Sequence, residues 1–240
     1  MESAKYCDIG GRKSNEDFAA VFESENNCFY VVADGLGGHN CGEVASSCVG
    51  EKMTELFSET LKNDTETMRD YFIKAQDSLL EKAEEAPERK GMRTTAVALA
   101  VCGNIATWGH IGDSRLYHIK DGEISSITAD HSVAYLSYLN GEIKYKDIRK
   151  SPDQNRLIRS MGSEGNFRPD ITESAVVEPG DAFLLCSDGF WEYISEKEIT
   201  TAFKKSHTAS RWLARMVRVV EKNGRSDSDR DNCSAITVFV

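Results

Sequence analysis

One two-residue turn, Asp121-Gly122, constrains the fold of this chain more than any other feature of its sequence. It separates two strand-like runs, 115–120 and 123–128. Asp-Gly is the pair that a two-residue hairpin turn favours, because both central residues need positive φ. Strands joined by so short a turn must be antiparallel, since a parallel pair needs a crossover of a dozen or more residues. The middle of the chain is therefore predicted to form antiparallel sheet.

Further strand-like runs and amphipathic segments occupy most of the remaining chain. The predicted strands are 17–23, 28–33, 94–102, 105–111, 115–120, 123–128, 171–177, 182–186 and 234–240. The predicted helices, from apolar residues at helical spacing and one capping box, are 42–61, 66–86, a helix opening at Ser195, and 209–223. Many antiparallel strands with helices grouped between them predict an α+β sandwich of layers.

The segment 132–168 interrupts this pattern. It is polar and irregular, with Tyr135, Tyr138 and Tyr145 set among charges, and we interpret it as a short helical excursion or flap over the surface. A chain of 240 residues is long enough for one large domain. We therefore treat 1–240 as a single domain and 132–168 as a flap subdomain within it.

Composition excludes several classes of partner. The net charge of -10 argues against nucleic acid, whose backbone calls for a basic face. No apolar run is long enough to cross a bilayer, and residues 1–5 lack the apolar core of a signal peptide, so we expect a cytoplasmic protein. The seven cysteines do not form the close pairs that hold zinc, and we expect reduced, mostly buried thiols. Without heptads or an exposed apolar stripe, a monomer is expected.

Aspartates stand beside strand-like runs at five places: Asp17, Asp34, Asp113, Asp188 and Asp231. A single Asp-Gly is ordinarily only a turn. Several carboxylates that met at one end of the sandwich would repel one another, and a hard divalent cation would remove that repulsion. A site built from oxygen ligands alone suits Mg²⁺ or Mn²⁺ better than zinc. The residues by themselves predict a divalent-metal site and go no further.

At these residues the sequence resembles the metal-dependent serine/threonine protein phosphatases of type 2C, particularly the compact bacterial-style members. The resemblance covers essentially the whole chain. Seven motifs occur in the family's order, at 12–17, 34–38, 91–95, 112–115, 128–132, 187–189 and 231–232. The resemblance implies two antiparallel sheets packed face to face, flanked by helices on both sides, and a variable flap at 132–168 that touches the protein substrate.

The resemblance also implies a metal centre. Asp34 would bridge two ions, and the carbonyl of Gly35 would bind one of them. Asp188 and Asp231 would complete the shell of the first ion. Asp113 matches the position that, with Asp188, holds a third and weaker ion in many bacterial members. The residues leave the choice between Mn²⁺ and Mg²⁺ open.

Three further positions match the family's catalytic residues. Arg12 matches the guanidinium that grips the substrate phosphate, and Glu16 and Asp17 would act through or beside coordinated water. Asn232 would orient Asp231. The implied reaction hydrolyses phosphoserine and phosphothreonine in proteins by a metal-bridging hydroxide, without a phosphoenzyme. The phosphatase is expected to oppose a cellular serine/threonine kinase.

The sequence departs from the family at one position. Many eukaryotic members carry a histidine, proposed as the general acid, where Leu36 stands. His39 reads as a turn or surface histidine, and His131 reads as a structural residue at the base of the flap. We therefore assign no general acid, and water on a metal is an alternative donor.

Two alternative functions stay open from the sequence. A non-catalytic relative of the same fold would serve as a binding module, but its expected sign is a missing metal aspartate, and none is missing. A hydrolase of small phosphate esters would share the same metal site. The polar, tyrosine-bearing flap favours a protein substrate over a small one.

Overall fold

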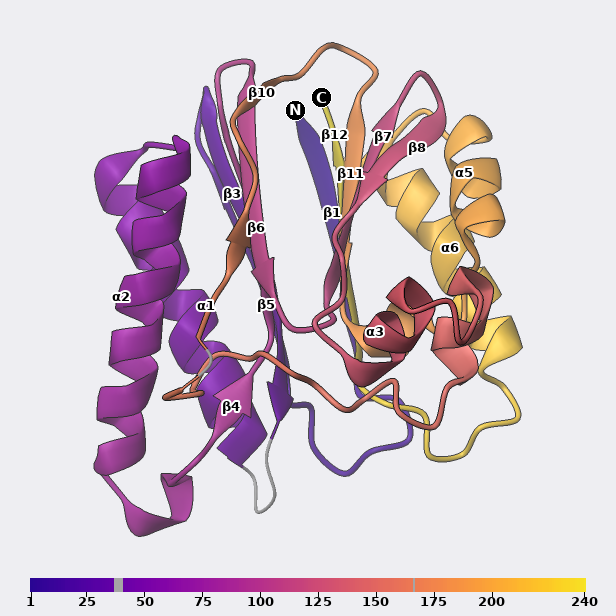
Figure 1. The fold of residues 1–240 in the computed structure, drawn as a ribbon. Helices are drawn as coiled ribbons and strands as arrows, with labels where there is room; N and C mark the ends of the chain where they lie inside the picture. The colour runs from indigo at the N-terminus through magenta and orange to yellow at the C-terminus, as the bar shows by residue number, and fades with distance from the viewer. Residues whose placement is uncertain (37–40, 166) are drawn as a thin grey trace.

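The structure, a computed structural model, describes residues 1–36, 41–165 and 167–240. Two antiparallel sheets pack face to face, with helices on the outer face of each (Figure 1). The fold predicted above, an α+β sandwich of two sheets flanked by helices, is confirmed. His39 and the Gly37-Gly38 part of the motif at 34–38 lie outside the described residues.

The first sheet has the strand order β10-β6-β5-β3-β2. Its strands are β2 (Asp17–Glu23), β3 (Asn27–Leu36), β5 (Ala96–Cys102), β6 (Ile105–Ile111) and β10 (Ala175–Val176), with the short β4 (Arg93–Thr94) paired to β3 and β9 (Asp170–Ile171) paired to β6. The second sheet has the order β1-β12-β11-β7-β8. Its strands are β1 (Glu2–Asp8), β7 (Arg115–Lys120), β8 (Glu123–Ile127), β11 (Ala182–Cys186) and β12 (Cys233–Phe239).

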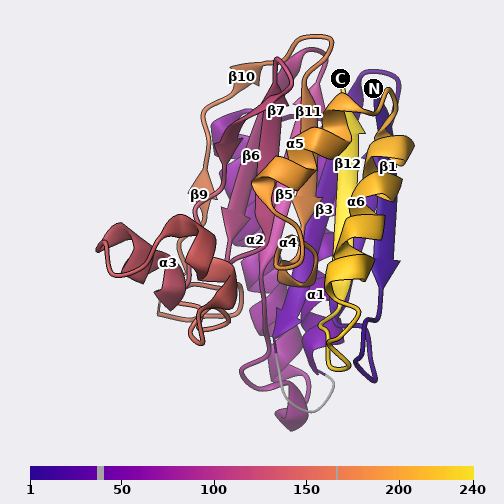
Figure 2. The same ribbon diagram turned by 90° about the vertical axis from the view of Figure 1, so that its right-hand side faces the viewer.

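Helices α1 (Cys41–Thr60) and α2 (Thr65–Glu84) cover the outer face of the first sheet (Figure 1). The second sheet is covered by α4 (Asp188–Trp191), α5 (Glu196–Lys204) and α6 (Ala209–Asn223), which Figure 2 shows from the front. The flap region contains α3 (Val133–Leu139) and the 3₁₀ turn η2 (Tyr145–Lys150), and another 3₁₀ turn, η1 (Pro87–Arg89), follows α2. No helix in the described ranges is long and apolar enough to span a membrane.

Strand β3 shows how the layers are held together. Its side chains alternate between the two faces of the sheet. Phe29 and Val31 pack against α1 and α2, whereas Tyr30 and Val32 pack between the two sheets. Each face therefore contributes to a different hydrophobic core, which explains why β3 reads as a continuous apolar run in the sequence.

The predicted turn at Asp121-Gly122 is confirmed. Asp121 has φ of 53° and Gly122 has φ of 78°, so both central residues adopt the left-handed conformation that a tight hairpin requires. β7 and β8 pair antiparallel on either side of it. The capping box at Ser195 is also present, because the Ser195 side chain accepts from the Glu198 backbone while the Glu198 carboxylate accepts in return.

Several predicted boundaries were wrong. The strand β1 was not predicted, the run 94–102 divides into β4 and β5 around Thr95, and 171–177 divides into β9 and β10. Thr95 leaves the ladder because its backbone N–H donates to the Asp34 carbonyl and its hydroxyl accepts from the Asp34 N–H. The motif at 187–189, predicted as a turn, opens the short helix α4.

Candidate metal centre

A cleft of about 160 Å³ opens at the end of the sandwich opposite the two termini. It is lined by Arg12, Glu16, Asp34, Gly35, Leu36, Asp113, Asn155, Leu157, Asp188, Asp231 and Asn232. Every residue predicted to bind metal therefore lies on this one cleft. Of the three predicted catalytic residues, Arg12 and Glu16 line the cleft and Asp17 lies behind it.

Both sheets supply carboxylates to the cleft. Asp17 and Asp34 face each other in the register of β2 and β3, and Asp113 follows the end of β6 in the same sheet. Asp188 follows β11 and Asp231 precedes β12 in the second sheet. Rigid strands thus aim the carboxylates, and the cleft lies where the two sheets end together.

Asp17, Asp113 and Asp188 are buried, and none of them forms an ion pair with a residue that the structure describes. Oδ1 of Asp188 and Oδ1 of Asp17 are buried and have no hydrogen-bond partner among the described residues. Burial and the neighbouring carboxylates raise the pKa of Asp188 to about 6, and burial followed by the charge of Asp188 raises the pKa of Asp34 well above its usual range. Burial, followed by the charge of Asp188, does the same to the pKa of Asp113. A divalent cation would offset both the burial and the repulsion.

Two glycines make room for oxygen ligands at one side of the cleft. A Cβ on Gly42, at the start of α1, would collide with Oε2 of Glu16 and lie 2.9 Å from the carbonyl oxygen of Gly35. The Glu16 carboxylate and the Gly35 carbonyl therefore face the same small space. Gly35 itself is tightly packed, because its own Cβ would meet the backbone of Gly42 and the Glu16 carbonyl. These oxygens are hard ligands of the kind that Mg²⁺ and Mn²⁺ prefer.

Arg12 lies at the mouth of the cleft. Its Nη2 is 2.9 Å from Oδ2 of Asp231, and 43% of its side chain is exposed to solvent. Asn232 fixes the same corner, since its Oδ1 accepts from the Glu16 backbone N–H at 2.7 Å and its backbone N–H donates to Oδ1 of Asp231 at 2.8 Å. The Asn232 side-chain amide also donates to the carbonyls of Ile9 and Ser14. One asparagine therefore holds both a predicted catalytic residue and a predicted metal ligand.

Asp17 is positioned differently from Glu16. Its Oδ2 accepts a 2.7 Å hydrogen bond from the Ser187 hydroxyl, and burial raises its pKa to about 7 although hydrogen bonds from Ser187 and Ser234 lower it. Its carboxylate therefore faces the interior of the molecule beneath the cleft. The role predicted for it beside coordinated water stays a prediction.

Sequence reasoning missed residues that hold the Asp113 loop. The indole N–H of Trp191 donates to the Asp113 carbonyl at 2.9 Å. The same indole packs on the guanidinium of Arg115, which is buried and makes two hydrogen bonds of 2.8 and 2.6 Å to Asp130. Trp191 was predicted as packing only. The motif at 112–115 includes Arg115, but nothing in its spacing to Asp130 indicates that the two side chains form an ion pair.

Two lining residues from the flap region, Asn155 and Leu157, were not singled out in the sequence. They lie within the predicted flap, which was expected to touch the substrate. No local pattern distinguishes Asn155 from the other polar residues of that irregular segment. The cleft is therefore closed on one side by a part of the chain whose course only the structure provides.

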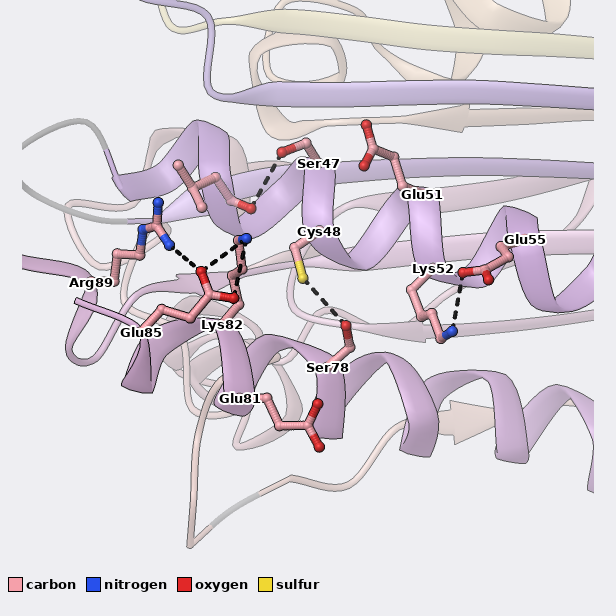
Figure 3. A pocket seen from close by; sticks show the side chains of 11 residues that line it. Ser47, Cys48, Glu51, Lys52, Glu55, Ser78, Glu81, Lys82, Glu85 and Arg89 are labelled. Carbon is pink, nitrogen blue, oxygen red and sulfur yellow. Dashed lines mark hydrogen bonds and ion pairs between the residues drawn. The ribbon is translucent and has the colours of Figure 1, made fainter.

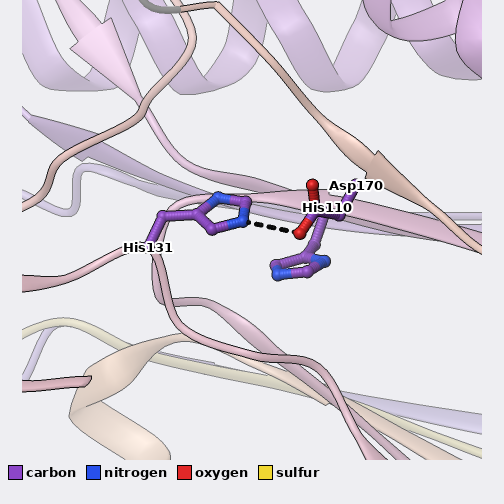
Figure 4. Close-up of side chains that lie close together, drawn as sticks. All are labelled: His110, His131 and Asp170. Atoms are coloured by element: carbon purple, nitrogen blue, oxygen red, sulfur yellow. Dashed lines mark hydrogen bonds and ion pairs between the residues drawn. The ribbon is translucent and has the colours of Figure 1, made fainter. Parts of the chain in front are cut away.

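A cluster of His110, His131 and Asp170 lies beside the Asp113 loop (Figure 4). Their nearest ligand atoms lie within 4.8 Å of one another, a spacing compatible with a metal. Both ring nitrogens of His131 and Nε2 of His110 already have partners, however. His131 Nδ1 accepts from the Gly112 N–H at 3.1 Å, so Nε2 carries the proton and donates to Asp170, also at 3.1 Å. His110 Nε2 donates to the Ala129 carbonyl at 2.7 Å. The cluster is therefore a hydrogen-bonded support for Gly112.

Leu36 lines the cleft, and no histidine is among the described residues that line it. The sequence has leucine where many eukaryotic members have the proposed general-acid histidine. The described residues that line the cleft do not supply another histidine in its place. His131 lies behind the Asp113 loop and does not reach the cleft lining.

A larger groove of about 540 Å³ runs between α1 and α2, in the helical layer outside the first sheet (Figure 3). Several of its charges pair with one another, for example Lys52 with Glu55 and Arg89 with Glu85. Its one thiol, Cys48, contacts the Ser78 hydroxyl at 3.7 Å, and burial raises the pKa of that thiol. This groove therefore offers neither an activated nucleophile nor a concentration of buried carboxylates.

Comparison with known proteins finds relatives that match most of the chain. The profile of the family described as Protein phosphatase 2C matches residues 9–230. The serine/threonine phosphatase stp of Listeria monocytogenes is 32% identical over 205 residues, which cover 83% of this chain and 81% of that protein. The profile match includes all of the predicted site residues except Asp231 and Asn232, which lie just beyond it.

Solved structures show the same fold. The serine/threonine phosphatase PstP/Ppp of Mycobacterium tuberculosis is similar with a TM-score of 0.86 and 28% sequence identity, covering 100% of this chain and 98% of that one. The catalytic domain of PstP in complex with two manganese ions gives a TM-score of 0.83 and 27% identity, covering 98% of this chain and 96% of that one.

Proposed function

We propose that this chain, a phosphatase that belongs to the protein phosphatase 2C family, removes phosphate from phosphoserine and phosphothreonine residues of other proteins by a two-metal hydrolysis. The observation that carries the proposal is the set of carboxylates on one cleft, where Asp188 has a buried oxygen without a partner among the described residues and Asp17, directly behind the cleft, has another. Such a set is stable as anions only with cations beside it.

The residues that would hold the ions come from both sheets. Asp34 would be the central ligand, because four other carboxylates lie close enough to raise the pKa of its side chain beyond the effect of burial. In order of decreasing effect they are Asp188, Asp17, Asp113 and Asp231. Asp188 and Asp231 would share one ion with it, and the Gly35 carbonyl and Glu16 face the space for another. Asp113 with Asp188 would hold a third. When bound, Mn²⁺ or Mg²⁺ would supply an activated water and offset the charge of the phosphoryl oxygens.

Arg12 would bind and orient the phosphate. Its planar fork can donate two hydrogen bonds to one phosphate group, and among the described residues its guanidinium donates to Asp231 alone. Once the charge of Asp231 is shared with a cation, the guanidinium is available to the substrate while it stays at the mouth of the cleft. Asn155 and Leu157 would exclude water from the side of the flap.

The leaving serine or threonine oxygen must take up a proton when the ester bond breaks. No side chain is assigned to this step, because Leu36 occupies the position of the family's histidine and the described lining of the cleft has none. Glu16, whose pKa is raised by burial and by the charge of Asp231, holds a proton more readily than an exposed glutamate. We assign it no role in this step.

The proposed setting is the cytosol, where the enzyme would oppose a serine/threonine kinase. None of the seven cysteines forms a disulfide with another described residue, which is compatible with a reducing compartment. Names of similar proteins, such as serine/threonine phosphatase stp, support a phosphoprotein substrate. We expect the phosphatase to act as a monomer.

The test is phosphate release from a phosphothreonine peptide with Mn²⁺, with Mg²⁺ and with EDTA. Asp34→Asn and Asp188→Asn should each lower kcat/KM more than about a hundredfold, since a ligand that neutralises transition-state charge contributes several kcal/mol. Asp77→Asn on the exposed face of α2 is the matched control and should not change the rate. Arg12→Lys, which keeps the charge but loses the fork, should raise KM.

Two results would overturn the proposal. A folded wild-type protein that stays inactive on phosphopeptides with either ion would point to a binding module. Higher kcat/KM on a small ester such as para-nitrophenyl phosphate than on phosphopeptides would point to a small-molecule phosphatase. Thermal stabilisation by Mn²⁺ is a separate readout, because it reports ion binding even where turnover fails.

A further inference from the structure

A second surface, separate from the metal cleft, lies on the helical layer that covers the second sheet. Helices α5 and α6 lie side by side over the outer face of the second sheet (Figure 2). Two adjoining hollows, of about 310 and 230 Å³, lie along them and share the residues Lys205, Arg215 and Arg218. We call the two hollows together the α5–α6 groove. None of its lining residues also lines the metal cleft.

The α5–α6 groove is strongly basic in an acidic protein. Residues 196–225 contain eight lysines and arginines but only three glutamates, while the whole chain has a net charge of -10. Five of these cations line the groove: Lys197, Lys205, Arg211, Arg215 and Arg218. All five are exposed. The positive charge is therefore local and concentrated on one face.

The groove cations have no acidic partners in the part of the chain that the structure describes. Neighbouring cations do have them: Arg149 pairs with Glu196 at 2.7 Å, and Lys204 pairs with Glu123. The one carboxylate that lines the groove, on Glu198, already accepts from the backbone and hydroxyl of Ser195 as part of the helix cap. Five exposed cations thus face the same groove without neutralisation.

The spacing of the arginines works against the helix that carries them. Arg211, Arg215 and Arg218 recur at intervals of four and three residues, so they lie on one face of α6. Like charges at this spacing destabilise a helix by about 0.2–0.5 kcal/mol per pair. The opposite face of α6 supplies Trp212, Met216 and Val220 to the core. The core therefore dictates the buried face but does not require three arginines on the exposed one.

The groove also has an apolar component between its charges. Ala202 and Val219 line the larger hollow, and Ala214 lines the smaller one. A free phosphate ion would use the cations but leave this apolar surface exposed. Single-stranded nucleic acid would need aromatic platforms for its bases, and no aromatic residue is among the residues that line either hollow. Basic rims around small apolar side chains instead match an acidic peptide that carries aliphatic side chains.

We propose that the α5–α6 groove is a docking site for an acidic, amphipathic segment of a partner protein. Carboxylates of the segment pair with the groove cations, and its aliphatic side chains pack on Ala202, Ala214 and Val219. The complementary charge relieves the repulsion among the three arginines of α6. Because the groove and the metal cleft share no residue, a partner bound here leaves the cleft free.

Direct binding tests the proposal without any turnover, so it is independent of the phosphatase activity. The probe is a fluorescein-labelled peptide of about four helical turns, built from glutamates with a leucine at every third or fourth position, followed by fluorescence anisotropy. The comparison probes are a glutamate-only peptide of the same length and a single-stranded oligonucleotide. The wild-type protein should bind the leucine-containing peptide, less tightly as salt is raised.

Charge reversal in the groove should weaken this binding. Arg215→Glu combined with Arg218→Glu should lower the affinity for the peptide about tenfold or more, because two attractive charges become two repulsive ones. Thr201→Glu, which adds a carboxylate at the rim and removes no packed group, should weaken it in the same direction. Arg69→Glu combined with Lys74→Glu on exposed positions of α2 is the matched control and should bind as wild type does. Circular dichroism would establish that every variant is folded.

Three results would overturn the proposal. Equal binding of the peptide to wild type and to both groove variants would place the binding elsewhere. Equal affinity for the glutamate-only peptide would remove the apolar contribution and leave only charge attraction. Tighter binding of the oligonucleotide, lost in the groove variants, would identify a nucleic-acid surface instead.

Discussion

The Ser187 hydroxyl donates a 2.7 Å hydrogen bond to Oδ2 of Asp17 in the interior of the protein. Asp17 begins β2 in the first sheet, and Ser187 follows β11 in the second. The same hydroxyl oxygen accepts from the Ser234 backbone N–H at 3.0 Å. This bond therefore joins the two sheets directly behind the predicted metal ligands, where Asp188 is the next residue along the chain.

Replacing Ser187 by alanine should weaken both the fold and the metal centre. Asp17 would keep a buried carboxylate with one fewer donor, and the Ser234 N–H would lose its acceptor. The free energy of unfolding should fall by about 1–3 kcal/mol, and more Mn²⁺ should be needed for half-maximal activity. Denaturant unfolding and a Mn²⁺ titration measure the two effects. Ser58→Ala, at an exposed hydroxyl on α1, should change neither; an equal effect of the two variants would contradict the assignment.

Asp188 should destabilise the metal-free protein in a manner that depends on pH. Its pKa in the folded protein, about 6, lies above its ordinary value of 3.8. The folded state therefore binds the proton more tightly than the unfolded state, and stability is lost as pH rises from about 4 through 6. In EDTA, Asp188→Asn should be more stable than wild type at pH 7.5, by about 1–3 kcal/mol, and not at pH 4. Calorimetry at the two pH values measures this.

Added Mn²⁺ should reverse that order. Wild type should gain stability at pH 7.5, because its carboxylates are the proposed ligands and bind the ion when deprotonated. Asp188→Asn should gain much less. If Mn²⁺ stabilised the two proteins equally, Asp188 would not be a ligand.

Gly42→Ala should be destabilising although it lies in a helix. Alanine is ordinarily favoured over glycine in helices by about 1 kcal/mol. Here the added Cβ would collide with the Glu16 carboxylate and approach the Gly35 carbonyl oxygen. Phosphatase activity should fall at least about tenfold, with a lower melting temperature. Gly165→Ala is the control, since nothing lies within 4 Å of the added Cβ there; unchanged activity of Gly42→Ala would argue against a site at this glycine.

His131 should stay neutral well below the pH at which an exposed histidine protonates. Burial, followed by the neighbouring His110, lowers its pKa to about 4. The depressed pKa contributes stability that is fully present above pH 6.5 and is lost as pH falls toward 4. Nuclear magnetic resonance of the imidazole Cε1 protons should find a signal that does not shift between pH 8 and 5. A His131 signal that shifts near pH 6.5 would mean that the imidazole is solvated.

The sequence predicted those parts of the fold whose signal is local. The hairpin at Asp121-Gly122 and the capping box at Ser195 each depend on a few adjacent residues, and both were confirmed. The strand β1 was missed because three of its seven residues are exposed and none is buried, so it lacks a clean apolar alternation. It is held by pairing with β12 at the far end of the chain. A partner more than two hundred residues away leaves no local pattern.

The same distinction applies to the metal centre. Each aspartate could be found from its position beside a strand-like run, because strands end in turns of recognisable composition. That they share one cleft, that Trp191 donates to the Asp113 carbonyl and that Asn155 closes one side depend on how the two sheets and the flap region pack. These relationships join residues from separate elements, so they could be known only from the structure.

The pairing of β1 with β12 has a consequence for the order in which this domain can form during synthesis. β12 lies between β1 and β11, and Asp231 and Asn232 immediately precede it. A nascent chain that has not yet released β12 from the ribosome leaves β1 without a neighbour in the second sheet and leaves β11 paired with β7 alone. It also lacks one predicted metal ligand and the asparagine that holds Glu16. The domain is therefore expected to fold after translation has passed β12, with catalytic competence among the last properties it acquires.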